Sequence, residues 1–127
     1  MATILIVDDE QSFLNAVSPI VGRSGHTILQ ATNAHDARQQ FTRNAPDLAI
    51  VDMIMPDTGG LETIAEMRKL NPGIKVIAVS GAAKAGRGRL LDWATRMGAN
   101  RAFSKPFVVA EFLDAVQALL DEKMSEN

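Results

Sequence analysis

Five short runs rich in aliphatic and β-branched residues recur along the chain and predict the strands of a sheet. They are Thr3–Val7, His26–Ala31, Leu48–Val51, Ile74–Val79 and Arg101–Phe103. The first, third and fourth runs are apolar without alternation, which is typical of strands that are covered on both faces. We therefore expect a sheet buried between two layers.

Helical periodicity occupies the segments between these runs. Apolar residues three or four positions apart form five stripes, which are Phe13, Leu14, Val17 and Val21; Ala34, Ala37 and Phe41; Leu61, Ile64 and Ala65; Leu90, Trp93, Ala94 and Met97; and Phe112, Leu113, Val116, Leu119 and Leu120. The alternation of strands and helices favours a parallel sheet with right-handed crossovers and helices on both faces. The predicted fold class is α/β.

Composition narrows the class of protein. The 127 residues show no repeat or linker, so we expect one domain over residues 1–127, with Lys123–Asn127 as a frayed tail. A net charge of −2 offers no basic surface for nucleic acid or an anionic membrane. The chain has no cysteine and no apolar run long enough for a signal peptide or a membrane span. These features favour a soluble, cytoplasmic protein.

Polar side chains stand where the predicted strands end. Asp8 and Asp9 follow the first run, Asp52 the third, Ser80 the fourth and Lys105 the fifth. The carboxyl ends of parallel strands share one edge, where doubly wound folds place their sites. If the strand order reverses beside the first strand, as in the flavodoxin-like order, these five side chains meet in one cleft.

The chemistry of this set suits a phosphoryl group. Three carboxylates repel one another unless a cation joins them, and oxygen ligands without His or Cys suit Mg²⁺. Mg²⁺, a lysine and a hydroxyl can bind the oxygens of a phosphoryl group, while a carboxylate oxygen attacks phosphorus in line. The set is a more specific signal than any one of its members.

Over almost its whole length the sequence resembles the receiver domains of two-component response regulators. The resemblance is carried by Asp8-Asp9, by the segment from Asp52 to Pro56, by Ser80-Gly81-Ala82 and by Lys105-Pro106-Phe107. It implies a five-stranded flavodoxin-like sheet in the order 2-1-3-4-5. It also implies a switch that catalyses only its own phosphorylation and dephosphorylation and is not otherwise an enzyme.

The resemblance assigns a role to each site residue. Asp52 would accept phosphate from a histidine kinase, a phosphotransfer protein or a small phosphodonor. Asp9, Asp52 and the main-chain carbonyl of Ile54 would bind Mg²⁺, with Asp8 acting through water. Ser80 would bind a phosphoryl oxygen.

Three further expectations concern the last strand and the residues that come after it. Lys105 would form an ion pair with the acceptor or its phosphate, and the Lys105–Pro106 bond would be cis. Phe103 would be the aromatic switch residue, turning into space that Ser80 vacates. The face formed by the fourth helix, last strand and last helix would then change for a downstream protein target or for an output domain absent from this chain.

Some details depart from the commonest family pattern. The stretch between Ser80 and Lys105 is longer than usual, with Gly86-Arg87-Gly88 as the expected insertion. Ile54 stands where many relatives carry a polar residue that influences attacking water, so we expect slow self-dephosphorylation. Phe103 lacks the hydroxyl of a tyrosine at its position.

The same residues also fit other interpretations. The acidic pair could cap the first helix, and Asp52 could be a turn residue. A phosphate-binding loop starting at Gly81 would have Arg87 where lysine is required. An aspartyl phosphatase would need a second Asp where Ile54 stands. A receiver-like module that binds a partner without phosphorylation is the main alternative.

Overall fold

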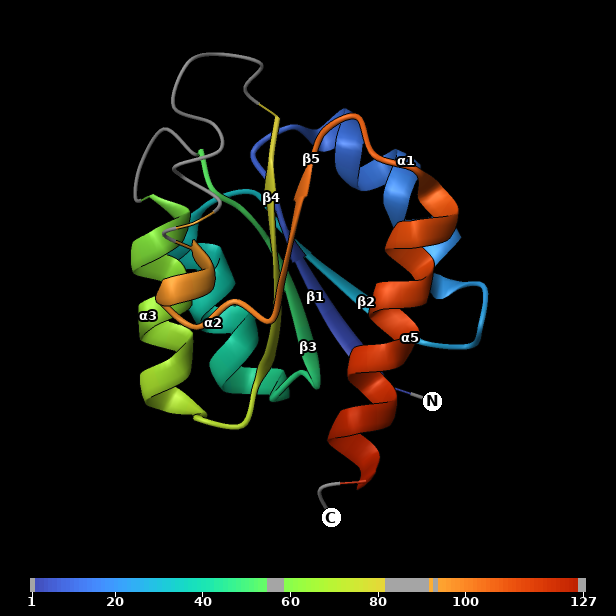
Figure 1. Cartoon of the computed structure of the whole chain (residues 1–127). Helices are drawn as coiled ribbons and strands as arrows, with labels where there is room; N and C mark the ends of the chain where they lie inside the picture. The colour runs from blue at the N-terminus through green and yellow to red at the C-terminus, as the bar shows by residue number, and fades with distance from the viewer. Residues whose placement is uncertain (1, 55–58, 82–91, 93, 126–127) are drawn as a thin grey trace.

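The computed structural model describes residues 2–54, 59–81, 92 and 94–125, and these include five parallel strands (Figure 1). The strands are β1 (Thr3–Val7), β2 (Thr27–Ala31), β3 (Leu48–Asp52), β4 (Lys75–Ser80) and β5 (Arg101–Ser104). Their order in the sheet is β2-β1-β3-β4-β5. This confirms the flavodoxin-like order, and it makes β1 and β3 neighbours at the centre of the sheet.

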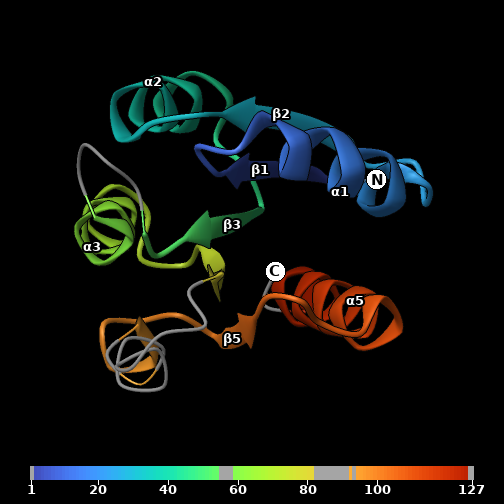
Figure 2. The same cartoon turned by 90° about the horizontal axis from the view of Figure 1, so that it is seen from above.

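Helices cover both faces of the sheet. They are α1 (Gln11–Gly22), α2 (Ala34–Asn44), α3 (Gly60–Leu70) and α5 (Val109–Ser125). Figure 2 shows α1 and α5 on one face and α2 and α3 on the other. In the fourth predicted helix, residues 92 and 94–96 are helical, whereas Leu90 and Trp93 lie outside the described residues. Helix α5 continues to Ser125, so most of the expected tail is helical.

The core consists of two layers, one on each face of the sheet. In β1, Ile4 and Ile6 pack on the side of α1 and α5, whereas Leu5 and Val7 pack on the side of α2 and α3. All four side chains are buried. Because both faces are covered, each successive residue of a central strand must be apolar, which explains the continuous runs in the sequence.

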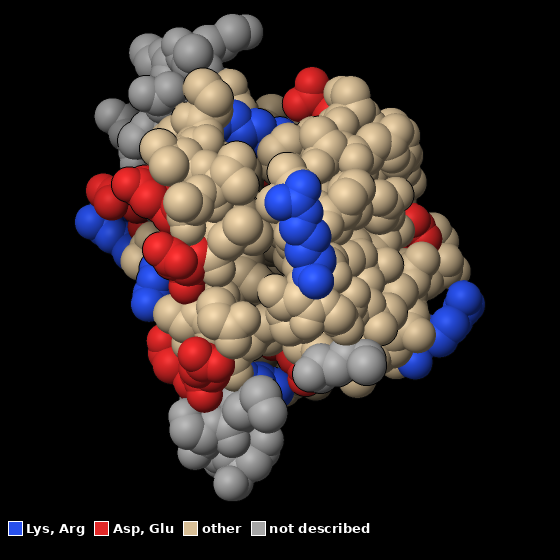
Figure 3. Space-filling view, turned by 90° about the vertical axis from the view of Figure 1, so that its right-hand side faces the viewer, with Lys and Arg blue, Asp and Glu red and all other residues tan. Residues whose placement is uncertain are grey.

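Helix α1 contains no charged residue. Its exposed positions are Gln11, Ser12, Asn15, Ala16 and Pro19. Figure 3 views the side of the molecule that carries α1 and α5, where uncharged side chains predominate. No helix in the described part of the chain has the length and apolar content to cross a bilayer.

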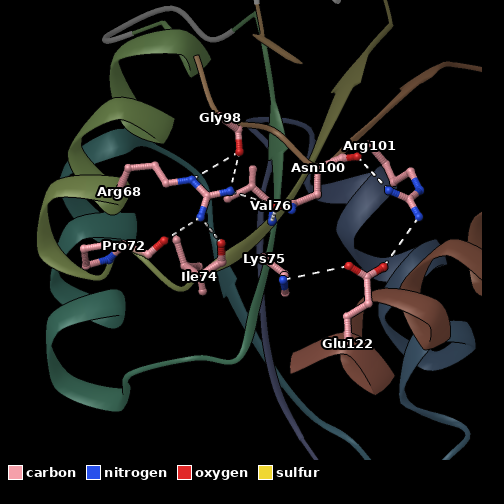
Figure 4. A network of polar contacts seen from close by, with 9 residues as sticks. All are labelled: Arg68, Pro72, Ile74, Lys75, Val76, Gly98, Asn100, Arg101 and Glu122. Atoms are coloured by element: carbon pink, nitrogen blue, oxygen red, sulfur yellow. Dashed lines mark hydrogen bonds and ion pairs between the residues drawn. The ribbon is translucent and has the colours of Figure 1, made fainter. Parts of the chain in front are cut away.

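Arg68 joins three segments at the end of the sheet where β4 and β5 begin (Figure 4). The polar residues of the candidate site lie at the other end of the strands. Its guanidinium donates to the main-chain carbonyls of Pro72, Ile74 and Gly98 and to Oδ1 of Asn100. Burial lowers the pKa of this side chain. The rigid fork of an arginine is suited to such multiple acceptors. Arg68 therefore ties the end of α3 to the segment that leads into β5.

Asn100 continues the ladder between β4 and β5 by one residue. Its Oδ1 accepts from the main-chain N–H of Val76 at 2.9 Å, and its own N–H donates to the carbonyl of Val76 at 2.7 Å. Nearby, Glu122 of α5 lies 3.9 Å from the buried Lys75 and 3.7 Å from Arg101. These contacts fix the start of β5 (Figure 4).

Candidate functional site

The three aspartates converge as the sequence predicted. Asp8 and Asp9 follow β1 and Asp52 ends β3, and one carboxylate oxygen from each lies within 4.8 Å of the others. Asp8 is only 1% exposed and Asp52 only 5%, whereas Asp9 is exposed. The pairing of Val7 with Val51 in adjacent parallel strands brings the two strand ends together.

Asp8 and Asp52 adopt the same local arrangement. Oδ1 of Asp8 accepts from the N–H of Glu10 at 2.8 Å, and Oδ1 of Asp52 accepts from the N–H of Ile54 at 3.1 Å. The N-cap of α1 is Glu10, and its side chain makes no capping bond. Capping therefore does not explain the acidic pair. The turn contact at Asp52 uses one oxygen and leaves Oδ2 for other chemistry.

Lys105 lies between these carboxylates. Its Nζ is 2.6 Å from Oδ2 of Asp8, 3.5 Å from Oε1 of Glu10 and 4.0 Å from Oδ2 of Asp52. The Lys105–Pro106 bond is cis, as the resemblance implied. Burial acts to lower the pKa of Lys105, but the hydrogen bond to Asp8 and the nearby negative charges outweigh it and raise the pKa. The predicted ion pair with Asp52 is present, although Asp8 is the nearer partner.

The environment of Asp52 makes its charge costly. Burial is the main cause that raises the pKa of this carboxyl to about 6, and the charges of Asp8 and Asp9 add to the effect. The hydrogen bond from Ile54 and the charge of Lys105 act in the opposite direction. A buried carboxylate next to like charges is stabilised when a cation binds there.

The hydroxyl of Ser80 is buried without a partner. Ser80 ends β4 with 0% exposure, and its Oγ forms no hydrogen bond within the described residues. Its main-chain carbonyl accepts from the N–H of Lys105 at 2.8 Å, which holds the two strand ends together. A buried polar group without a partner is costly, so this hydroxyl is suited to bind an incoming oxygen.

The expected role of Phe103 needs correction. In β4 and β5, Val79 pairs with Phe103 and Ala78 with Ala102. Phe103 therefore packs on the side of α1 and α5, where its ring lies 5.3 Å from that of Phe112. Ser80 follows Val79 and faces the other side, which it shares with Ala102. A movement of Ser80 does not vacate space for the Phe103 ring.

Gly60 lies directly behind Asp52. A Cβ at Gly60 would stand 2.4 Å from the main-chain oxygen of Asp52 and 2.6 Å from Cα of Met53. The N–H of Gly60 donates to the carbonyl of Met53 at 3.3 Å. The start of α3 can approach the end of β3 only because this residue has no side chain.

Sequence reasoning missed two residues at this site. The Nζ of Lys105 lies 3.9 Å from the centroid of the Phe13 ring, and Glu10 is the third carboxylate near the same ammonium. Both residues follow the acidic pair at the start of α1, and that proximity was the available signal. Pro56 and Gly86-Arg87-Gly88 lie outside the described residues.

Taken together, the site offers carboxylate oxygens, one ammonium and one buried hydroxyl, with no His or Cys ligand among the described residues. This set fits a hard divalent cation such as Mg²⁺. It also fits a tetrahedral oxyanion, because Lys105 and Ser80 can bind its oxygens. The neighbourhood of Asp52 is therefore suited to phosphoryl chemistry.

Comparisons with known proteins agree with this chemistry. The family model of the response regulator receiver domain matches residues 4–117. The chain is 31% identical over 120 residues to sporulation initiation phosphotransferase F of Bacillus subtilis, covering 94% of each protein. It is 35% identical over 118 residues to the transcriptional regulatory protein CssR of the same species, but spans only 51% of that longer protein.

Solved structures show the same fold. A receiver domain protein from Methanospirillum hungatei matches with a TM-score of 0.91 and 28% identity, over 100% of this chain and 99% of that one. A receiver domain protein from Clostridium thermocellum matches with a TM-score of 0.92 and 26% identity, over the whole of both chains. From the family match and the arrangement of its acidic site, this chain belongs to the response regulator receiver family of two-component signalling.

Proposed function

We propose that this receiver domain is switched by Mg²⁺-dependent phosphorylation of Asp52. The observation that supports the proposal best is the gathering of Asp8, Asp9 and Asp52 within 4.8 Å, with the ammonium of Lys105 beside them. Carboxylates this close repel one another unless cations compensate them, and Mg²⁺ would add to the compensation that Lys105 supplies. A site for a phosphoryl group explains all four side chains.

The hydrogen bonds at the site suggest how Mg²⁺ would be held. Both oxygens of Asp8 already accept hydrogen bonds, from Glu10 and Lys105, so Asp8 would act through water. Asp9 and Asp52 would supply direct ligands, and the resemblance adds the main-chain carbonyl of Ile54. When bound, Mg²⁺ neutralises part of the charge of the approaching phosphoryl group.

Asp52 would act as the nucleophile. Its Oδ2 attacks phosphorus of a phosphohistidine or an acyl phosphate and forms a new O–P bond, while the bond from phosphorus to the donor breaks and the donor leaves with the electron pair. The Oγ–H of Ser80 donates to one phosphoryl oxygen. Lys105 forms an ion pair with the same group.

The output would arise at the edge of the sheet formed by β5, next to β4, the strand that Ser80 ends. Phosphorylation adds roughly two negative charges at Asp52. Ser80 moves toward them, and the end of β4 moves with it. The face formed by the fourth helix, β5 and α5 then changes for a downstream protein target. Because Phe103 lies on the opposite face of the sheet from Ser80, the movement of Ser80 would not depend on its ring.

The phosphodonor would be a histidine kinase or a phosphotransfer protein. It must place its phosphoryl group above Asp52, next to the uncharged helix α1. Val108 and Val109, which follow Lys105 at the start of α5, are exposed apolar residues on this side. Apolar surface beside the acceptor would contact the donor protein while the acidic cleft receives its phosphoryl group.

Intact-mass spectrometry after treatment with acetyl phosphate and Mg²⁺ tests the proposal. The wild type and Asp114→Asn, a control at an exposed site on α5, should each gain one phosphoryl group. Asp52→Asn should gain none, and chelation of Mg²⁺ should prevent the gain in the wild type and in Asp114→Asn. Phosphorylation of Asp52→Asn would refute the assignment. No phosphorylation of any protein would favour a module that binds its partner without phosphorylation.

A further inference from the structure

The ring of Phe13 contacts the site from the side of α1. Its centroid lies 3.9 Å from Nζ of Lys105, within the range of a cation–π interaction. Phe13 itself packs edge-on against Phe107, with 6.3 Å between the ring centroids, and Phe107 stacks on Phe112 of α5 at 4.5 Å. The ring that faces the ammonium is therefore supported by the aromatic side chains behind it.

The carboxylates of Asp8, Glu10 and Asp52 compete for the ammonium of Lys105. Asp8 holds it at 2.6 Å, whereas Oδ2 of Asp52 is 4.0 Å away, beyond hydrogen-bond distance. Glu10, at 3.5 Å, also lies nearer to the ammonium than Asp52 does. The ring of Phe13 contacts the ammonium in its position beside Asp8 and so adds an attraction that is specific to this position.

We propose that Phe13 is a positioning residue that holds Lys105 beside Asp8 in the resting state and releases it when Asp52 carries a phosphoryl group. The release rests on the proposed function. The new negative charge attracts Lys105, and the contact with the ring is given up. Phe13 does not touch the phosphoryl group and acts only through Lys105.

The contact between Phe13 and Lys105 affects ligand binding at Asp52. The cation–π contact stabilises the resting position and is absent after release, so it opposes binding of a phosphoryl group or its analogue. Phe13→Leu keeps an apolar side chain but removes the aromatic face. Phe13→Tyr keeps the face and serves as the matched control.

The resting position can be observed directly by NMR. Protons on Cε of a lysine above an aromatic face are shifted upfield by the ring current. The chain has five lysines, and Lys105→Ala identifies the signal of Lys105. We expect an upfield Cε signal in the wild type and Phe13→Tyr, and an ordinary shift in Phe13→Leu. The same ordinary shift in all three proteins would overturn the proposal.

Binding of beryllofluoride with Mg²⁺, a phosphoryl analogue, tests the release. Phe13→Leu should bind it about two- to fivefold more tightly than the wild type, and Phe13→Tyr should match the wild type. On binding, the Cε signal of Lys105 should lose its upfield shift. Equal affinity of Phe13→Leu and Phe13→Tyr would refute the role of the ring. If no protein binds the analogue, the proposed function fails and the release with it, whereas the signal in the free protein still reports the resting contact.

Discussion

The ammonium of Lys105 lies 2.6 Å from the carboxylate of Asp8, a residue 97 positions earlier in the chain. Asp8 is almost completely buried. The pair connects the end of β1 to the segment after β5, across the full width of the acidic site. In the resting protein Lys105 is thus the cation that compensates the buried carboxylates.

Removing this cation should destabilise the protein in the absence of metal. Lys105→Met leaves Asp8 buried without its charged partner, and we expect a loss of about 3 kcal/mol in the free energy of unfolding. Mg²⁺ should restore more stability to this variant than to the wild type. Urea unfolding with and without Mg²⁺ measures both effects. Lys69→Met, at an exposed site on α3, removes the same charge as a control, and equal losses in the two variants would contradict the prediction.

The raised pKa of Asp52 predicts how stability depends on pH without metal. Its pKa is about 6 in the folded protein, against an ordinary value of 3.8. The stability linked to this carboxyl group is therefore fully present below the ordinary pKa of 3.8 and is lost as the pH rises through the folded-state pKa of about 6. Asp52→Asn removes this loss. Above pH 7 the variant should be more stable than the wild type by about 3 kcal/mol.

Urea unfolding in chelator across this pH range measures the difference between Asp52→Asn and the wild type. The two should converge near the ordinary pKa of an aspartate and diverge toward neutral pH. Mg²⁺ should reduce the difference, because a cation stabilises the ionised carboxylate. A constant difference at all pH values would show that the ionisation of Asp52 is not the cause.

Substitutions of the adjacent Gly59 and Gly60 provide a controlled test of the contact between β3 and α3. Gly60→Ala forces the start of α3 away from Asp52 and Met53. This change should lower the free energy of unfolding by about 2 kcal/mol or more and should weaken Mg²⁺ binding. A Cβ at Gly59 would meet nothing within 4 Å, so Gly59→Ala should alter neither property appreciably. Calorimetry of Mg²⁺ binding and thermal unfolding test this, and equal behaviour of the two variants would exclude the steric explanation.

The network of Arg68 should contribute strongly to stability. Arg68→Met leaves several main-chain carbonyls without their donor. We therefore expect the free energy of unfolding to fall by about 3 kcal/mol. Arg68→Lys should recover only part of this, since one ammonium cannot span acceptors on both sides. Arg96→Met at an exposed site is the control. Hydrogen exchange should show that residues 98–104 lose protection in the Arg68 variants only.

The position of Phe103 predicts that its ring is not needed for switching. Phe103→Leu should cost about 1 kcal/mol of stability through lost packing against Phe107 and Phe112. It should leave the affinity for beryllofluoride unchanged. A marked fall in that affinity, with the fold intact by circular dichroism, would restore the switch role that the sequence suggested.

Much of the fold could be predicted because a strand that is buried on both faces of the sheet appears in the sequence as a continuous apolar run. The continuous runs ending at Val7 and Val51 locate the central strands. The acidic site followed from them, because parallel strands end at one edge and Asp8, Asp52 and Lys105 stand at those ends. Both inferences needed only strand positions and not side-chain conformations.

The remaining features depend on details that a linear pattern does not carry. The face on which Phe103 lies is decided by strict alternation in a strand of four residues. The nearer partner of Lys105 is decided by the rotation of a long side chain. Arg68 has the sequence context of a solvated cation in the last turn of a helix, and only the tertiary fold brings carbonyls from other segments around it.

The side-chain oxygen that Asn100 offers to Val76 sets the register of the last strand. With this start fixed, the number of residues from Asn100 to Lys105 decides which face of the sheet each residue between them occupies. Deleting one residue between Asn100 and Lys105 would place the side chains after the deletion on the opposite face of the sheet. The lysine would then move away from the acidic cleft. An amide far from the cleft thereby determines whether the ammonium can reach it.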